Sequence, residues 1–135
     1  MLTVAASRTT PTGWTLRAVV SAHAVAIAGQ PVFAGVYLTG DYDGLSLHAA
    51  GANIVTSIGY LQLIVAIVVW ARLRQVRPLL ATLAVVAAET VQYFAGLDGA
   101  LWLHLPLGVT TIVAVVLQFI DAWRRALLRE GAAHA

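Results

Sequence analysis

An all-α membrane protein, folded as a single antiparallel up-down bundle of four transmembrane helices, is the architecture expected for this 135-residue chain. Hydrophobic residues make up 60% of the sequence and charged residues only 10%, whereas an ordinary soluble domain is about a quarter charged. Four apolar stretches are long enough to cross the hydrocarbon layer, which takes about 20 residues of helix. They do not alternate apolar and polar residues as the strands of a membrane barrel do.

The first helix is expected to follow Arg17 and to end at the Leu-Thr-Gly turn, and the second follows the loop "TGDYDGLS". The third begins after "RLRQVR" and the fourth after "DGA". These connections are short, so sequential helices are expected to be antiparallel neighbours. Pro31, inside the first helix, predicts a kink. The four spans are expected at about residues 17–38, 47–71, 78–97 and 101–123.

The basic residues predict the orientation in the membrane. All eight are arginines, placed before the first span, between the second and third, and after the fourth: Arg8, Arg17, Arg72, Arg74, Arg77, Arg124, Arg125 and Arg129. The other two loops carry Asp41, Asp43 and Asp98 and no base. Positive charge stays on the cytoplasmic side in short loops, so both termini are expected in the cytoplasm of a bacterium, with the chain in its inner membrane. The predicted topology accounts for the excess of basic over acidic residues. Lipid is therefore the expected neighbour, and no nucleic-acid partner is predicted. The first sixteen residues do not resemble a cleaved signal peptide.

Two histidines lie near the outer ends of apolar spans. His48 and His104 fall in the first turns of the second and fourth helices, which lie diagonally across a simple ring of four. The two imidazoles are therefore expected to face each other at one depth across the core. Haem iron is commonly held by axial histidine, and bundles build such sites from inward-facing side chains on opposing helices. Gly51 and Gly108, at helical spacing from the histidines, would leave room for a flat ring.

The segment "GQPVFAGVYLTGDYDGLSLHAAGANIV" resembles one four-helix half of the haem A synthase family. It is also similar to small bacterial four-helix membrane proteins that carry the same two histidines. The resemblance implies a haem site at His48 and His104, after the Leu-Thr-Gly turn at residues 38–40. It does not imply the oxygenase chemistry, because the chain has one half, no cysteine and no acidic residue beside either histidine in its helix.

Three further polar residues, His23, Glu89 and His134, carry groups that can ionise. His23 lies too far toward the cytoplasmic end to share a cofactor with the outer pair, and is expected to be a hydrogen-bonded or packing residue. Glu89 lies near mid-membrane, where a charge is costly; we expect it to be neutral and hydrogen-bonded to Gln30 or a backbone group, with a proton-relay role as an alternative. His134 is expected to be an exposed tail group.

These observations predict a b-type cytochrome that holds one haem b through His48 and His104 and transfers electrons. A quinone or a redox protein is the partner considered, and pairing with a second copy is left open. One alternative is a haem-modifying or quinol-oxidising membrane oxidoreductase. The other is a structural or accessory subunit without redox function, in which the histidines only hydrogen-bond at the outer helix ends.

Overall fold

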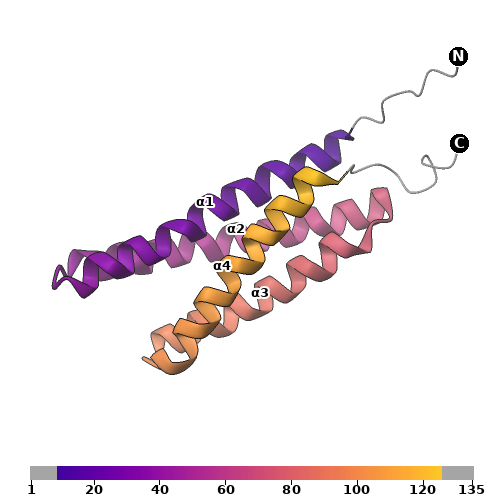
Figure 1. Cartoon of the computed structure of the whole chain (residues 1–135). Helices are drawn as coiled ribbons and strands as arrows, with labels where there is room; N and C mark the ends of the chain where they lie inside the picture. Colours follow the sequence, from indigo (N-terminus) through magenta and orange to yellow (C-terminus); the bar gives the residue numbers. More distant parts are fainter. Residues whose placement is uncertain (1–8, 126–135) are drawn as a thin grey trace, which may run out of the picture.

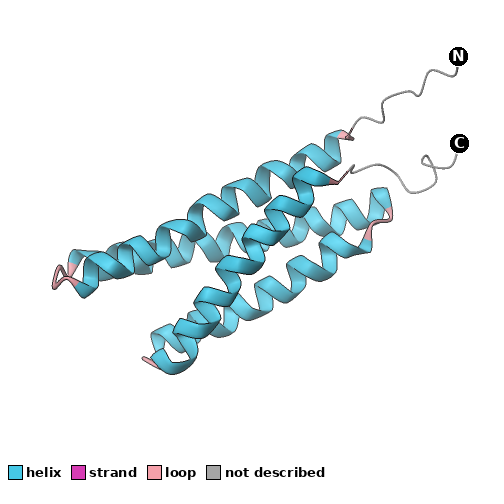
Figure 2. Ribbon diagram, viewed as in Figure 1, coloured by secondary structure: helices cyan, strands magenta, loops and turns pink. Residues whose placement is uncertain are grey.

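A computed structural model describes residues 9–125 of the chain. Its regular secondary structure there is all α-helix, joined by short loops (Figure 2). Arg8, Arg129 and His134 lie outside the described residues, as does the first half of the segment judged not to be a signal peptide. Each of the four helices is long and apolar enough to cross a membrane. They are α1 (Pro11–Leu38), α2 (Asp43–Leu73), α3 (Val76–Leu97) and α4 (Leu101–Arg124) (Figure 1).

Local sequence signals account for the helix ends. Thr10 caps α1, because its hydroxyl accepts a hydrogen bond from the Gly13 N–H at 3.1 Å, and Pro11 then occupies a position where a missing N–H costs nothing. Gly40 and Gly99 lie in the first and third loops with φ of +94° and +71°. Only glycine adopts this conformation without strain, so each reverses the chain directly after a helix.

The helices form a ring in which only neighbours pack together. α1 contacts α2 and α4, and α3 contacts the same two, so α2 and α4 lie diagonally opposite each other. α1 and α2 approach closely at Gly44, where an added Cβ would lie 3.0 Å from the carbonyl oxygen of Phe33. Small residues at such positions allow helices to pack tightly in lipid.

Two clusters of buried apolar side chains fill the interior. One gathers around Leu16, Val69 and Leu73 near the start of α1, and the other around Ile27 and Val115. Three polar side chains lie between the two clusters along their helices, namely His23, Gln62 and Gln118. The core therefore contains a polar layer, and its hydrogen bonds must be satisfied within the protein because lipid offers none.

Candidate functional site

His48 and His104 meet across the bundle although their helices do not contact each other. Their ring centroids are 5.9 Å apart and the ring planes are inclined by 78°. His48 is the sixth residue of α2 and His104 the fourth of α4. Both helices therefore supply their histidine from the first or second turn.

Each of these rings is fixed through Nδ1. His48 Nδ1 donates to the carbonyl oxygen of Gln30 at 3.2 Å, and His104 Nδ1 donates to that of Gln92 at 2.9 Å. A carbonyl can only accept, so Nδ1 must carry the hydrogen in both rings and a neutral ring then has its lone pair at Nε2. Neither Nε2 has a hydrogen-bond partner among residues 9–125. This is the arrangement by which a backbone carbonyl orients a metal-binding histidine.

Glycines make room for the polar groups around the pair. An added Cβ at Gly96 would lie 2.8 Å from His104 Nδ1, so this residue lets the imidazole pack against α3. The Gln30 amide lies directly over Gly51, and the Gln92 amide lies over Gly108, where an added Cβ would be 3.4 Å from Nε2. Gly51 and Gly108, expected to leave space beside the histidines, thus face glutamine side chains.

The terminal amide of the Gln30 side chain is buried without a hydrogen bond. Neither its Nε2 nor its Oε1 has a partner within residues 9–125. An unsatisfied amide in an apolar interior costs roughly 1–3 kcal/mol, so nearly all buried polar groups in proteins are paired. This amide lies between Gly51 and the carbonyl that holds His48. The buried polar group without a partner therefore lies beside the histidine pair.

The two halves of the site are similar in composition. The hairpin of α1 and α2 supplies Gln30, His48 and Gly51, and the hairpin of α3 and α4 supplies the same three residue types. The sequence contains a signal for this similarity that was missed: Phe-Ala-Gly at residues 33–35 and again at 94–96, then Leu-x-Leu-His at 45–48 and 101–104. Each half thus presents one imidazole to the centre of the bundle, and the backbone carbonyl of a glutamine orients that imidazole.

A second polar cluster lies deeper in the core. His23 Nε2 is 2.8 Å from Glu89 Oε1, and His23 Nδ1 donates to Gln62 Oε1 at 2.9 Å. The Gln62 amide nitrogen donates to the Thr82 hydroxyl at 3.1 Å and to Gln118 Oε1 at 2.6 Å. The cluster joins all four helices through buried hydrogen bonds. These bonds tie the four helices together at one level of the core and hold them in register.

The expectation that Glu89 would bond to Gln30 or to a backbone group is wrong, because its partner is His23. α1 begins at Pro11, earlier than the predicted start at residue 17. At 1.5 Å per residue, His23 lies about 18 Å from the start of α1 and Glu89 about 20 Å from the start of α3. The two side chains therefore reach the same depth, and His23 is the hydrogen-bonded residue that was expected.

No family model, curated protein or solved structure matches the chain. Within the described residues, no three histidine or acidic side chains gather as they would around a bare metal ion.

Proposed function

We propose that this protein is a small membrane cytochrome in which His48 and His104 hold one haem b near the outer face of a bacterial inner membrane. The observation that carries the proposal is the pair of imidazoles 5.9 Å apart, each with Nδ1 bonded to a backbone carbonyl. Two imidazoles bound to one metal through Nε2 have ring centres about 6 Å apart, since each metal–nitrogen bond is about 2 Å and each nitrogen lies roughly 1 Å from its ring centre.

The surroundings of the pair also suit a planar ligand. The two hairpins present like groups from opposite sides, which is compatible with a ring that has two similar faces. The unpaired Gln30 amide supports a ligand at this place, because its hydrogen bonds are unsatisfied in the protein alone. The amides over Gly51 and Gly108 would turn aside to admit the ring.

A haem held by His48 and His104 would supply the exchange of one electron, and two histidine ligands would leave its iron no open position for oxygen. The chain's own part is to orient both imidazoles through Gln30 and Gln92 and to exclude water with apolar helices. Electron transfer between a membrane donor and an outer acceptor is therefore favoured over oxygenation. The proposal includes an antiparallel bundle with both termini cytoplasmic, supported by the arginines, which are absent from the loops at 39–42 and 98–100.

The purified full chain tests this proposal by its colour. We expect a red protein with a low-spin haem spectrum and one haem per chain. His48→Ala and His104→Ala should each abolish that spectrum, whereas the matched control His134→Ala should keep it. Colourless wild-type protein expressed with haem in excess, or an unchanged spectrum in either variant, would refute the ligand assignment.

A structural role is the second candidate, and one observation favours it. The glutamine side chains fill the space over both glycines, and each imidazole already has a hydrogen bond. In this case the histidines tie α2 to α1 and α4 to α3 at their outer ends. Two results together would support this function over the cytochrome: wild-type protein that contains no haem, and a lower stability of the His48→Ala and His104→Ala variants.

A further inference from the structure

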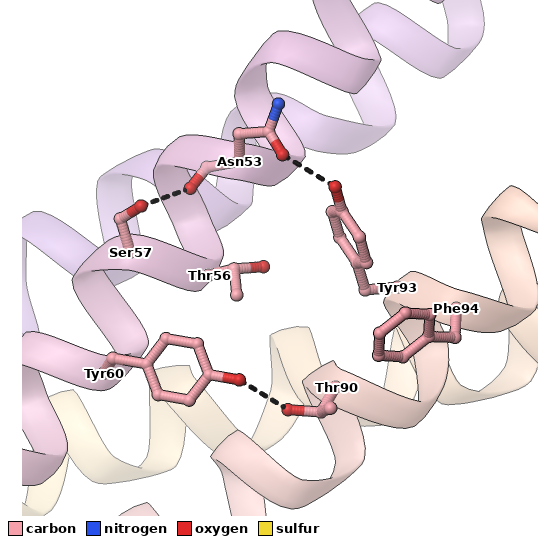
Figure 3. Close-up of a pocket in the computed structure, with 7 residues that line it drawn as sticks. All are labelled: Asn53, Thr56, Ser57, Tyr60, Thr90, Tyr93 and Phe94. Carbon is pink, nitrogen blue, oxygen red and sulfur yellow. Dashed lines mark hydrogen bonds between the residues drawn. The ribbon is translucent and has the colours of Figure 1, made fainter.

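A pocket of about 280 Å³ opens on the flank of the bundle between α2 and α3, away from the core clusters (Figure 3). Six of its seven lining residues carry a hydroxyl or amide group, although both helices are apolar enough to span a membrane. The lining residues are Asn53, Thr56, Ser57, Tyr60, Thr90, Tyr93 and Phe94. Lipid chains cannot hydrogen-bond these groups, so each must find its partner within the protein or on a bound ligand.

The pocket lies at the depth of the hydrocarbon layer. Asn53 and Tyr60 are 10 and 17 residues beyond Asp43, where α2 begins, which places them about 15 and 25 Å along a helix that rises 1.5 Å per residue. The headgroups of phospholipids remain at the surface of a hydrocarbon layer roughly 30 Å thick. A ligand for this pocket must therefore dissolve in hydrocarbon and still carry hydrogen-bonding atoms.

The hydrogen bonds of the pocket leave donors for a ligand. Thr90 uses its hydroxyl hydrogen on the carbonyl oxygen of Val86 at 2.7 Å, so Tyr60 must donate to Thr90, and this bond is long at 3.3 Å. The Thr56 hydroxyl points into the pocket in Figure 3 and bonds to nothing within residues 9–125. The Asn53 amide nitrogen likewise has no partner among these residues, since only its oxygen is bonded, to Tyr93 at 2.8 Å.

The free donors and the aromatic walls indicate the class of ligand. Donors require acceptor oxygens on the ligand. The rings of Tyr93 and Phe94 are inclined by 87°, so a flat ring can lie against the face of one and meet the edge of the other. The volume is near the small end for ligand pockets, roughly 300 Å³, which fits one ring system and not a whole lipid. We propose that this pocket binds the ring of a membrane-dissolved quinone, with a carbonyl oxygen accepting from the Thr56 hydroxyl and the tail lying in lipid.

The position of the pocket connects it to the histidine pair. Tyr93 follows Gln92, whose carbonyl holds His104, and Asn53 is two residues beyond Gly51. A quinone here is the electron donor or acceptor of the proposed cytochrome, and this role rests on the proposed function. Binding itself does not, because neither histidine lines the pocket.

Equilibrium dialysis of decylubiquinone against the full chain in detergent micelles tests the binding. We expect saturable binding by the wild type and about threefold to tenfold weaker binding by Thr56→Val, which removes one hydrogen bond while keeping the shape. Thr110→Val is the matched control: its hydroxyl is exposed on α4 and bonded to the Pro106 carbonyl at 2.8 Å, so its affinity should be unchanged.

The two proposals fail separately in this experiment. The His48→Ala/His104→Ala double variant should retain the quinone affinity, and colourless protein that binds quinone would refute only the cytochrome. Red protein whose quinone uptake equals that of empty micelles, or is the same in wild type and Thr56→Val, would overturn the pocket. Disulfide-linked dimers formed in high yield by Asn53→Cys, with no quinone uptake by the wild type, would also overturn it, because a second copy would then cover this face.

Discussion

His23 and Glu89 form a buried pair in the middle of the bundle, with 2.8 Å between His23 Nε2 and Glu89 Oε1 and only 0% and 4% of the side chains exposed. Because Gln62 uses its nitrogen to donate to Thr82 and Gln118, its oxygen accepts from His23 Nδ1. One proton is then shared between His23 Nε2 and Glu89 Oε1. The pair is neutral overall wherever that proton lies, which makes it tolerable in lipid.

Removing the carboxyl should destabilise the bundle more than neutralising it. In Glu89→Ala, His23 loses its partner in an environment without water, and we expect a loss of about 3 kcal/mol. Glu89→Gln keeps a group that can donate to His23 Nε2 and should cost less than half as much. Thermal unfolding in detergent, followed by circular dichroism, measures both. Equal losses in the two variants would show that the hydrogen bond to His23 contributes little.

Gly59 should be coupled to the same pair. An added Cβ at Gly59 would lie 2.7 Å from Glu89 Oε2, so Gly59→Ala should cost about 1–3 kcal/mol through overpacking. In the Glu89→Ala background the carboxyl is absent and the cost should be much smaller. A double-mutant cycle of unfolding midpoints measures this coupling. Additive effects would mean that the added methyl group is accommodated by a shift of α2.

The sequence alone predicted the four helices because hydropathy and length decide which segments can cross a membrane. The matched depth of His48 and His104 also follows from loop lengths and helix order. The partner of Glu89 was missed because α1 begins at Pro11, six residues before the expected start at Arg17, so that His23 lies near the middle of the bundle. Helix ends are set by capping and loop packing, which hydropathy does not describe.

Other features depend on how each helix is rotated about its axis. The backbone carbonyls of Gln30 and Gln92 accept the histidine hydrogen bonds because they turn toward α2 and α4. Every residue has a backbone carbonyl, so the residue type does not reveal which carbonyl is the acceptor. The pocket between α2 and α3 is similar. Asn53, Ser57 and Tyr60 recur at helical spacing in the sequence, but Thr90 and Tyr93 face them only through the packing of α3.

Arg17 should anchor the end of α4. Its side chain is buried, with Nε donating to the Ala122 carbonyl at 2.9 Å and Nη2 to the Arg125 carbonyl at 3.0 Å. It also lies over the rings of Trp14 and Trp123. Arg17→Ala should therefore lower the free energy of unfolding by about 2 kcal/mol. Arg17→Lys should recover only part of this stability, because one ammonium group cannot reproduce the planar guanidinium that donates to two carbonyls.

Arg77→Ala provides the control for Arg17. The Arg77 side chain is 66% exposed and its nearest acid oxygen, on Asp121, is 3.6 Å away. Exposed pairs contribute less than about 1 kcal/mol, so this variant should unfold close to the wild-type temperature. Similar midpoints for Arg17→Ala and Arg77→Ala would show that the buried contacts of Arg17 do not stabilise the bundle.

Gly96 should determine the position of His104. In Gly96→Ala the new methyl group would lie 2.8 Å from His104 Nδ1 and 2.9 Å from Cε1, so the ring must move and its bond to the Gln92 carbonyl is lost. Displacing an orienting partner typically weakens metal binding about tenfold or more, and the haem affinity of the full chain should fall accordingly. Gly35→Ala, in the other Phe-Ala-Gly segment, is the control because nothing lies within 4 Å of its added Cβ. A haem titration that gives the same affinity for both variants would contradict this role of Gly96.

The orientation in the membrane can be measured with single cysteines, since the chain has none of its own. The arginines around the loop between α2 and α3 should hold that loop in the cytoplasm, so Gln75→Cys should react with a membrane-impermeant maleimide only after the bacterial cells are permeabilised. Asp98→Cys, in the exposed loop between α3 and α4, should react in intact cells. If only Gln75→Cys is labelled in intact cells, the bundle is inverted. The histidine pair, which lies at the same end as Asp98, would then face the cytoplasm.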